Sequence, residues 1–127
     1  MRSDVAYDDT FDPPAPVLPA LLSAPGGSRG ALLPMLLDTG ADCTVVPLQV
    51  ARALGLPAVG QLALRGVTGT AVQVPVFAAS IRIGRSERIA RVVGFGGEAI
   101  LGRDVLATLV ARLDGPRGSF RLSLGRR

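Results

Sequence analysis

The sequence contains no histidine and no lysine, and it has a single cysteine, Cys43. Without histidine, the chain cannot form a Ser-His-Asp or Cys-His catalytic pair or a histidine-ligated zinc site. One cysteine can form neither an internal disulfide nor a cysteine-rich metal site. If the chain is an enzyme, we therefore expect carboxylates to carry the proton transfers, with no metal and no other cofactor.

Long apolar runs are also missing. Prolines, glycines or charges interrupt every apolar stretch before it reaches the roughly 18 residues needed to span a bilayer, so no membrane partner is expected. Residues 1–9 lack the basic start and apolar core of an export signal. A cytoplasmic location is therefore the default expectation.

The formal net charge of +4 raises the question of a nucleic-acid partner, because clustered arginines attract phosphates. All fourteen basic residues are arginines, but they are scattered along the chain. Only one tyrosine and four phenylalanines are present for base stacking, and no nucleic-acid-binding motif is found. A surface solvated by arginines is the simpler interpretation, and no nucleic-acid partner is expected.

The length of 127 residues corresponds to one domain. Residues 1–14 contain four of the ten acidic residues and end in two prolines, a composition typical of an extended segment. We expect a flexible N-terminal tail over residues 1–14 and a folded domain over residues 15–127.

Sixteen glycines and ten prolines divide the apolar residues into short segments, a pattern that favours strands over long helices. Partial alternation on both sides of Thr68-Gly69 predicts a β-hairpin over residues 61–74. The apolar spacing predicts short helices over residues 48–54 and 99–109. Further strands are expected over residues 17–22, 31–37, 43–47, 75–83, 89–93 and 119–124.

Few acidic residues follow the tail, and Asp38 is the most unusual of them. It directly follows a leucine-rich run, where an ionised carboxylate is costly unless it is used or satisfied. An Asp-Thr-Gly triplet alone is commonly an ordinary turn. Asp104 is expected to complement the first turn of the second helix. The six acidic residues beyond the tail are Asp38, Asp42, Glu87, Glu98, Asp104 and Asp114.

The context of Asp38 extends the motif. Residues 36–47 (Leu-Leu-Asp-Thr-Gly-Ala-Asp-Cys-Thr-Val-Val-Pro) closely resemble the active-site segment of retropepsins. Residues 100–106 (Ile-Leu-Gly-Arg-Asp-Val-Leu) resemble the segment that opens the C-terminal helix of that family. Two motifs in the right order, with a hairpin between them, argue against coincidence. The resemblance implies an all-β, closed barrel-like retropepsin (acid protease) fold with one short C-terminal helix.

The resemblance also implies roles for individual residues. Asp38 is similar to the catalytic aspartate, and Gly40 to the glycine that allows two such loops to approach each other. Thr39 is similar to the residue that locks the two loops together. Asp42 and Arg103 match a pair that forms an ion pair beside the substrate channel of the family.

The remaining candidates are a loop residue and three pocket residues. Ala41 completes the active-site loop. Leu36, Cys43 and Val45 are candidates for the wall of a substrate pocket, although core packing explains Leu36 and Val45 equally well. A lone cysteine usually behaves as a small hydrophobic residue, which favours pocket wall or core over a reactive thiol.

One Asp-Thr-Gly per chain is not enough for this chemistry. The aspartic mechanism needs two carboxyl groups that share one proton, so the second must come from a second copy of the chain. The expected assembly is a homodimer with twofold symmetry. Because terminal strands tie the dimer together in the family, residues 119–124 are the candidate interface strand.

The predicted hairpin resembles the mobile flap that covers the substrate in the family, with residues 65–71 as its candidate tip. The flap residues are Gly66, Val67, Thr68 and Gly69, and they include fewer glycines than the usual viral pattern. The expected activity is that of an aspartic endopeptidase, which hydrolyses extended peptide segments with an Asp-activated water. The alternative is a catalytically silent retropepsin-like module that binds peptides or mediates dimerisation.

Overall fold

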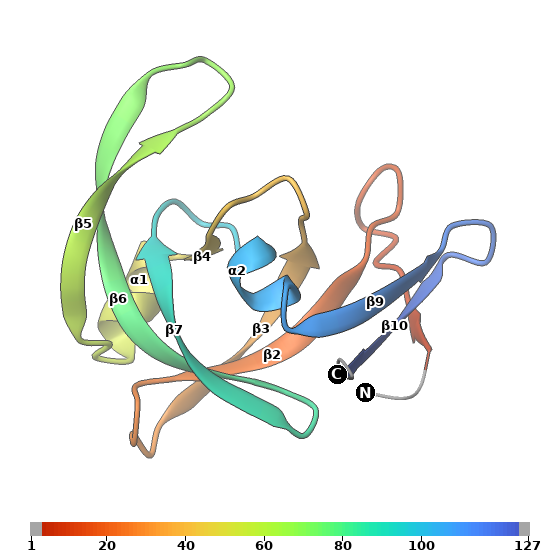
Figure 1. Cartoon of the computed structure of the whole chain (residues 1–127), viewed down its shortest axis with the longest axis horizontal. Helices are drawn as coiled ribbons and strands as arrows, with labels where there is room; N and C mark the ends of the chain where they lie inside the picture. Colours follow the sequence, from red (N-terminus) through yellow and green to blue (C-terminus); the bar gives the residue numbers. More distant parts are fainter. Residues whose placement is uncertain (1–3, 125–127) are drawn as a thin grey trace.

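The computed structural model describes residues 4–124 as an assembly of strands with two short helices (Figure 1). No helix between these residues is long and apolar enough to cross a membrane. The strands are β1 (Val5–Ala6), β2 (Val17–Ser23), β3 (Gly30–Leu37), β4 (Thr44–Val46), β5 (Ala58–Arg65), β6 (Ala71–Ile83), β7 (Ser86–Gly94), β8 (Ile100–Leu101), β9 (Leu109–Asp114) and β10 (Ser119–Leu124), and the helices are α1 (Leu48–Ala53) and α2 (Arg103–Leu106).

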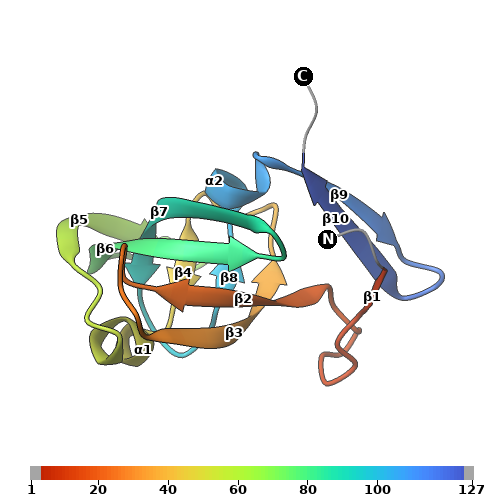
Figure 2. The same cartoon turned by 90° about the horizontal axis from the view of Figure 1, so that it is seen from below.

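Six strands close into a barrel. The larger sheet has the order β2-β3-β8-β4-β7-β6-β5, and β2 also pairs with β6 from Leu21↔Arg82 to Ser23↔Ser80. Figure 2 shows β2 and β6 side by side where the ring closes. β5 lies outside the ring, paired with β6 alone. The predicted all-β, closed barrel-like fold with a short C-terminal helix is thereby confirmed.

Alternation along the strands fills the barrel with apolar side chains. Leu18, Ala20 and Leu22 of β2 are fully buried, whereas the residues between them are not. Burial of one leucine side chain stabilises the fold by about 1.5–3 kcal/mol. A shift of β2 by one residue would expose this whole set, so the apolar pattern determines the register of β2.

The predicted hairpin is present and longer than expected. β5 pairs with β6 from Ala58↔Phe77 to Arg65↔Ala71. The turn between them contains Gly69 with a φ of 81°, a left-handed conformation that favours glycine. β6 continues from the hairpin into the barrel as one strand of 13 residues. Residues 71–74 and 75–83, which the sequence predicts as separate elements, are therefore parts of one strand.

The helix predicted over residues 99–109 is wrong in extent. Ile100 and Leu101 form β8, α2 covers only Arg103–Leu106, and Leu109 begins β9. Leu101 and Val105 are both buried, as their spacing suggests, but they belong to different elements. The apolar period of this segment thus arises from a strand, one helical turn and a second strand that face the same core.

Part of the expected flexible tail is structured. Val5 and Ala6 form β1, which pairs with Phe120 and Ser119 of β10, and the Tyr7 N–H donates to the Gly118 carbonyl (2.8 Å). The aromatic rings of Tyr7 and Phe120 lie 6.1 Å apart. The tail assignment missed this because Val5 and Tyr7 are two of a few apolar residues in a stretch that is rich in aspartate and proline. Residues 1–3 of the predicted tail lie outside the described residues.

The smaller sheet has the order β1-β10-β9, with β10 in the centre. β10 pairs with β9 over all of Ser119–Leu124 and with β1 at two residues. The backbone groups along one side of β10, the expected interface strand, are therefore already used within the chain. Among the described residues, β9 has no strand on its outer edge.

Candidate active site

Asp38 lies where two neighbouring parallel strands end. β3 and β8 run parallel, with Leu36 opposite Ile100 and Leu37 opposite Leu101. Because parallel strands end at the same edge of a sheet, the residues that follow them meet. The Asp38 N–H donates to the Leu101 carbonyl (3.0 Å). The two motifs, separated by about half of the chain, are thus joined by backbone pairing.

The chain turns sharply after Asp38. The Gly40 N–H donates to Asp38 Oδ1 (2.9 Å), and the Ala41 N–H donates to the Asp38 carbonyl (3.2 Å). A side chain that accepts from the backbone two residues ahead is the usual way in which aspartate forms a turn. Asp38 is half-buried, whereas Thr39 and Gly40 are exposed. One carboxylate oxygen therefore organises the loop, and no hydrogen bond within the described residues occupies the other, Oδ2.

Arg103 holds the loop from the side of α2. Its Nη1 donates to the Thr39 carbonyl (2.9 Å), its backbone N–H donates to the Ala41 carbonyl (2.9 Å), and its Nη2 forms an ion pair with Asp42. The structure thus brings the expected pair Asp42 and Arg103 together. Both side chains are largely exposed, so the ion pair alone is worth little. Arg103 acts on the loop mainly through its contacts with the backbone.

Two further residues at this place were not predicted to belong to the site, because the sequence gives Thr44 no role and gives Asp104 only a role in the first turn of the second helix. Thr44 is fully buried, and its Oγ1 donates to Asp104 Oδ1 (2.8 Å) and accepts from the Gly102 N–H (3.1 Å). The Thr44 N–H donates to Asp104 Oδ2 (3.2 Å). A buried hydroxyl in a strand and a carboxylate sixty residues away carry no joint sequence signal. Only the alternation of β4, which places the Thr44 side chain inward, could have indicated that Thr44 is a buried polar residue.

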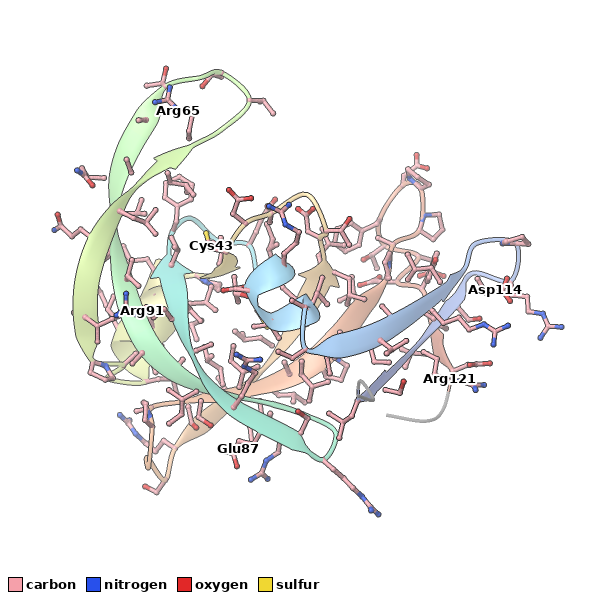
Figure 3. The ribbon with its side chains drawn as sticks, viewed as in Figure 1. Cys43, Arg65, Glu87, Arg91, Asp114 and Arg121 are labelled. Atoms are coloured by element: carbon pink, nitrogen blue, oxygen red, sulfur yellow. The ribbon has the colours of Figure 1, made fainter. Side chains whose placement is uncertain are left out.

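An apolar cluster lies beside the loop and under the hairpin. Val74, Val76 and Val93 are buried, and Cys43, Val45, Leu62 and Leu64 pack against them. Figure 3 shows Cys43 between the β5–β6 hairpin and α2. The pocket candidates Cys43 and Val45 thus share one surface. Leu36 lies outside this cluster, between Val17 of β2 and Ile100 of β8.

The environment of Cys43 disfavours its thiolate. Burial raises the pKa of the Cys43 thiol above its usual value of 9.0, and the negative charges of Asp104 and Asp42 raise this pKa further. The thiol is therefore protonated at neutral pH. This supports the interpretation of Cys43 as an apolar wall residue rather than a nucleophile.

The hairpin tip projects away from the barrel (Figure 1). Residues 65–71 are all exposed, and the side chain of Val67 is completely so. Arg65 Nη1 donates to the Gly69 carbonyl (2.6 Å), which closes the tip on itself. Between residues 4 and 124, no three acidic or cysteine side chains are grouped in a way that could hold a metal ion.

Residues 24–105, more than half of the chain, match the family model described as aspartyl protease. The chain belongs to this family. Among solved structures, a retropepsin-like aspartic protease from Rickettsia conorii superposes with a TM-score of 0.65 at 16% identity, covering 94% of this chain and 88% of that protein. This likeness identifies the barrel of the aspartyl protease chain as a retropepsin fold.

Two viral proteins are also similar to this retropepsin-like chain. The EIAV protease, solved in complex with the inhibitor HBY-793, has 26% identity and a TM-score of 0.57, covering 73% of this chain and 86% of its own. The protease of simian foamy virus has 17% identity and a TM-score of 0.54, with coverages of 72% and 92%. No curated protein sequence shows a significant match to the chain.

Proposed function

We propose that this retropepsin-like protein is an aspartic endopeptidase in which Asp38 residues from two copies of the chain form the catalytic pair. The observation that carries the proposal is the setting of Asp38. It stands half-exposed at the shared end of β3 and β8, in a loop held by the backbone of Leu101 and by Arg103. A membership in the aspartyl protease family supports the same reaction.

Two adjacent carboxyl groups cannot easily both ionise, so the pair holds one proton. The ionised Asp38 takes a proton from a water molecule, whose oxygen attacks the carbonyl carbon of the peptide. The protonated Asp38 of the other copy transfers its proton to the carbonyl oxygen as negative charge develops there, which gives a gem-diol. In its collapse the second Asp38 takes back a hydroxyl proton, the C–N bond breaks, and the first Asp38 gives the proton that it took from water to the departing nitrogen.

The loop has features that suit a twofold contact. Thr39 and Gly40 are exposed at its apex, and the Thr39 carbonyl is already occupied by Arg103. We propose that Thr39 and Gly40 meet their counterparts in the second copy. The absence of a side chain at Gly40 leaves room for the two Asp38 carboxyls to approach.

We propose β9, rather than β10, as the strand that joins the two copies. β9 has a free edge within the described part of the chain, whereas β10 is central. An unpaired edge presents N–H and C=O groups to a second strand. β9 also exposes Val110 and Leu113, which are about half accessible. Burial of these side chains favours addition of a second copy at this edge.

The proposed substrate is an extended, mainly apolar peptide segment. It would lie between the Asp38 loop and the flap formed by residues 65–71, in the manner of an added strand. Cys43 and Val45 would form an apolar wall, and Leu36 would bound the other side of the loop. Asp42 and Arg103 would supply polar contacts at the end of this channel.

The test is cleavage of a purified apolar peptide library by the wild-type protein and by Asp38→Asn. This variant removes the ionisable group while it keeps the acceptor for the Gly40 N–H. Cleavage by the wild type that falls at least about 10³-fold in Asp38→Asn supports the proposal. Equal cleavage by both proteins overturns it. Peptide binding without cleavage at any pH favours the silent binding module instead.

A further inference from the structure

The active-site loop is held at both of its ends. At its start, the Asp38 N–H donates to the Leu101 carbonyl (3.0 Å). At its end, Thr44 is fully buried and makes three hydrogen bonds to residues 102–104. The loop therefore spans two anchors on the same short segment, which runs from β8 into α2.

The second anchor depends on one carboxylate. Asp104 Oδ1 accepts from Thr44 Oγ1 (2.8 Å) and from the Val105 N–H (2.9 Å), and Asp104 Oδ2 accepts from the Thr44 N–H (3.2 Å). Hydrogen bonds to an ionised acceptor are about twice as strong as neutral ones. Asp104 thereby ties the first residue of β4 to the first turn of α2.

The Thr44 hydroxyl connects this carboxylate to the glycine of the second motif. A hydroxyl has one proton, which Thr44 Oγ1 gives to Asp104, and it accepts the Gly102 N–H (3.1 Å) with a lone pair. Gly102 is buried, so its N–H would have no partner if the hydroxyl were removed. Both the donor and the acceptor function of Thr44 are used.

We propose that Asp104 and Thr44 are positioning residues that set the place of the Asp38 carboxyl for the reaction. The inference rests on the proposed function, because it assigns them a role in the same catalytic site. Neither residue needs to touch the substrate. They act by fixing the far end of a seven-residue loop that runs from Asp38 to Thr44. The Asp38 carboxyl in this loop must be placed within a fraction of an ångström relative to the Asp38 carboxyl of the second copy.

The chain offers a matched control for this pair. Ser80 is buried, and its Oγ donates to Glu87 Oε2 at 2.8 Å, the same distance as between Thr44 and Asp104. Figure 3 shows Glu87 at the end of the molecule opposite the hairpin tip, which Arg65 marks. Ser80→Ala therefore removes a similar hydrogen bond from a buried hydroxyl to an exposed carboxylate in the same barrel, away from the loop.

Cys43 supplies a readout that does not depend on activity. It is the only cysteine, and it directly precedes Thr44. Its alkylation by iodoacetamide under native conditions reports how often this end of the loop opens. Thr44→Val is the main variant because it removes the hydroxyl at nearly constant volume and leaves the charge of Asp104 beside the thiol. Thr44→Ser retains the hydroxyl and serves as the rescue.

The experiment compares wild type, Thr44→Val, Thr44→Ser, Asp104→Asn and Ser80→Ala. We measure kcat/KM on one peptide, the dimer dissociation constant by sedimentation, and the alkylation rate of Cys43. We expect kcat/KM to fall by about 10- to 100-fold in Thr44→Val and Asp104→Asn at an unchanged dimer constant. The alkylation rate of Cys43 should rise by about fivefold or more in Thr44→Val. In Thr44→Ser, both kcat/KM and the alkylation rate should stay near wild type.

Three results would overturn the inference. The first is a wild-type kcat/KM and alkylation rate in Thr44→Val. The second is a loss of kcat/KM in Ser80→Ala equal to that in Thr44→Val. The third is a loss of kcat/KM that dimer dissociation alone explains. Either result would mean that the bond stabilises the fold or the dimer in general and does not position Asp38. If the wild type cleaves no peptide, the proposed function fails. The alkylation rate of Cys43 then still tests the anchor. A faster rate in Thr44→Val than in Ser80→Ala supports it, and equal rates in the two variants refute it.

Discussion

Gly102 lies directly against the backbone of Cys43. A Cβ built on Gly102 would come within 2.5 Å of both the carbonyl carbon and the carbonyl oxygen of Cys43. Its φ is −88°, so close approach, rather than a left-handed conformation, is the reason for glycine at this position. This contact lets the Gly102 N–H reach Thr44 and lets Arg103 reach the loop.

Gly102→Ala should destabilise the protein by about 1–3 kcal/mol, because the added methyl group forces the loop and β8 apart. Urea unfolding monitored by circular dichroism measures the loss. Gly97→Ala is the control, since a Cβ at Gly97 meets nothing within 4 Å. The control should stay within about 0.5 kcal/mol of wild type. Equal stability of the two variants would show that the backbones can separate at no cost.

Alkylation of Cys43 should have a pH midpoint above that of the unfolded chain. Burial raises the pKa of the thiol in the folded protein, with further contributions from Asp104 and Asp42. A raised pKa means less thiolate at any given pH, and therefore slower alkylation. The midpoint should move down in Asp42→Asn, which removes one of these charges, but remain above the unfolded value. A folded midpoint at or below that of the urea-unfolded chain would contradict the prediction.

Val67→Asp should raise KM for an apolar peptide by about tenfold, because it places a charge where the flap is proposed to close over the substrate. Val67 is completely exposed, so the free energy of unfolding should change by no more than about 0.5 kcal/mol. Leu32→Asp is the control, since Leu32 is an exposed apolar residue near the start of β3, away from Asp38. An unchanged KM in Val67→Asp would argue against the flap.

Val110→Asp should weaken dimerisation by at least about tenfold, since it puts a charge in each copy at the proposed interface strand. Val110 lies opposite Ser123 and away from the buried Phe120, so the folded chain should tolerate the change. Sedimentation over a concentration series gives the dissociation constant. A dimer as tight as wild type would locate the interface elsewhere than at β9. Circular dichroism checks that the variant is folded.

Much of the site could be read from local pattern. The leucine-rich run before Asp38 marks the end of β3, and Thr68-Gly69 marks the hairpin tip, as the structure has it. These predictions succeed because strands and tight turns depend on alternation and on residues close in sequence. The pairing of Asp42 with Arg103 was predicted from a family resemblance, since the residues are far apart in the chain.

Other features escaped the sequence because their partners lie far away. The sequence places Val5 and Tyr7 in a tail because their contacts are with Phe120 and Gly118, more than 100 residues away. Residues 99–109 read as one helix because a strand, a turn of helix and a second strand all bury apolar side chains against one core. Asp104 reads as a residue that complements a helical turn, and it does accept from the Val105 N–H, but its main partner is Thr44.

The sequence by itself determined which chemistry we propose. Without histidine or lysine, carboxylates are the expected reactive groups, and with one Asp-Thr-Gly per chain the proposed pair requires a second copy. Only the tertiary structure decided what holds Asp38 in place and which strand edge is free. These depend on the parallel register of β3 and β8, on the close approach of Gly102 to Cys43 and on the central place of β10. Such contacts join segments far apart in the chain, and no local periodicity encodes them.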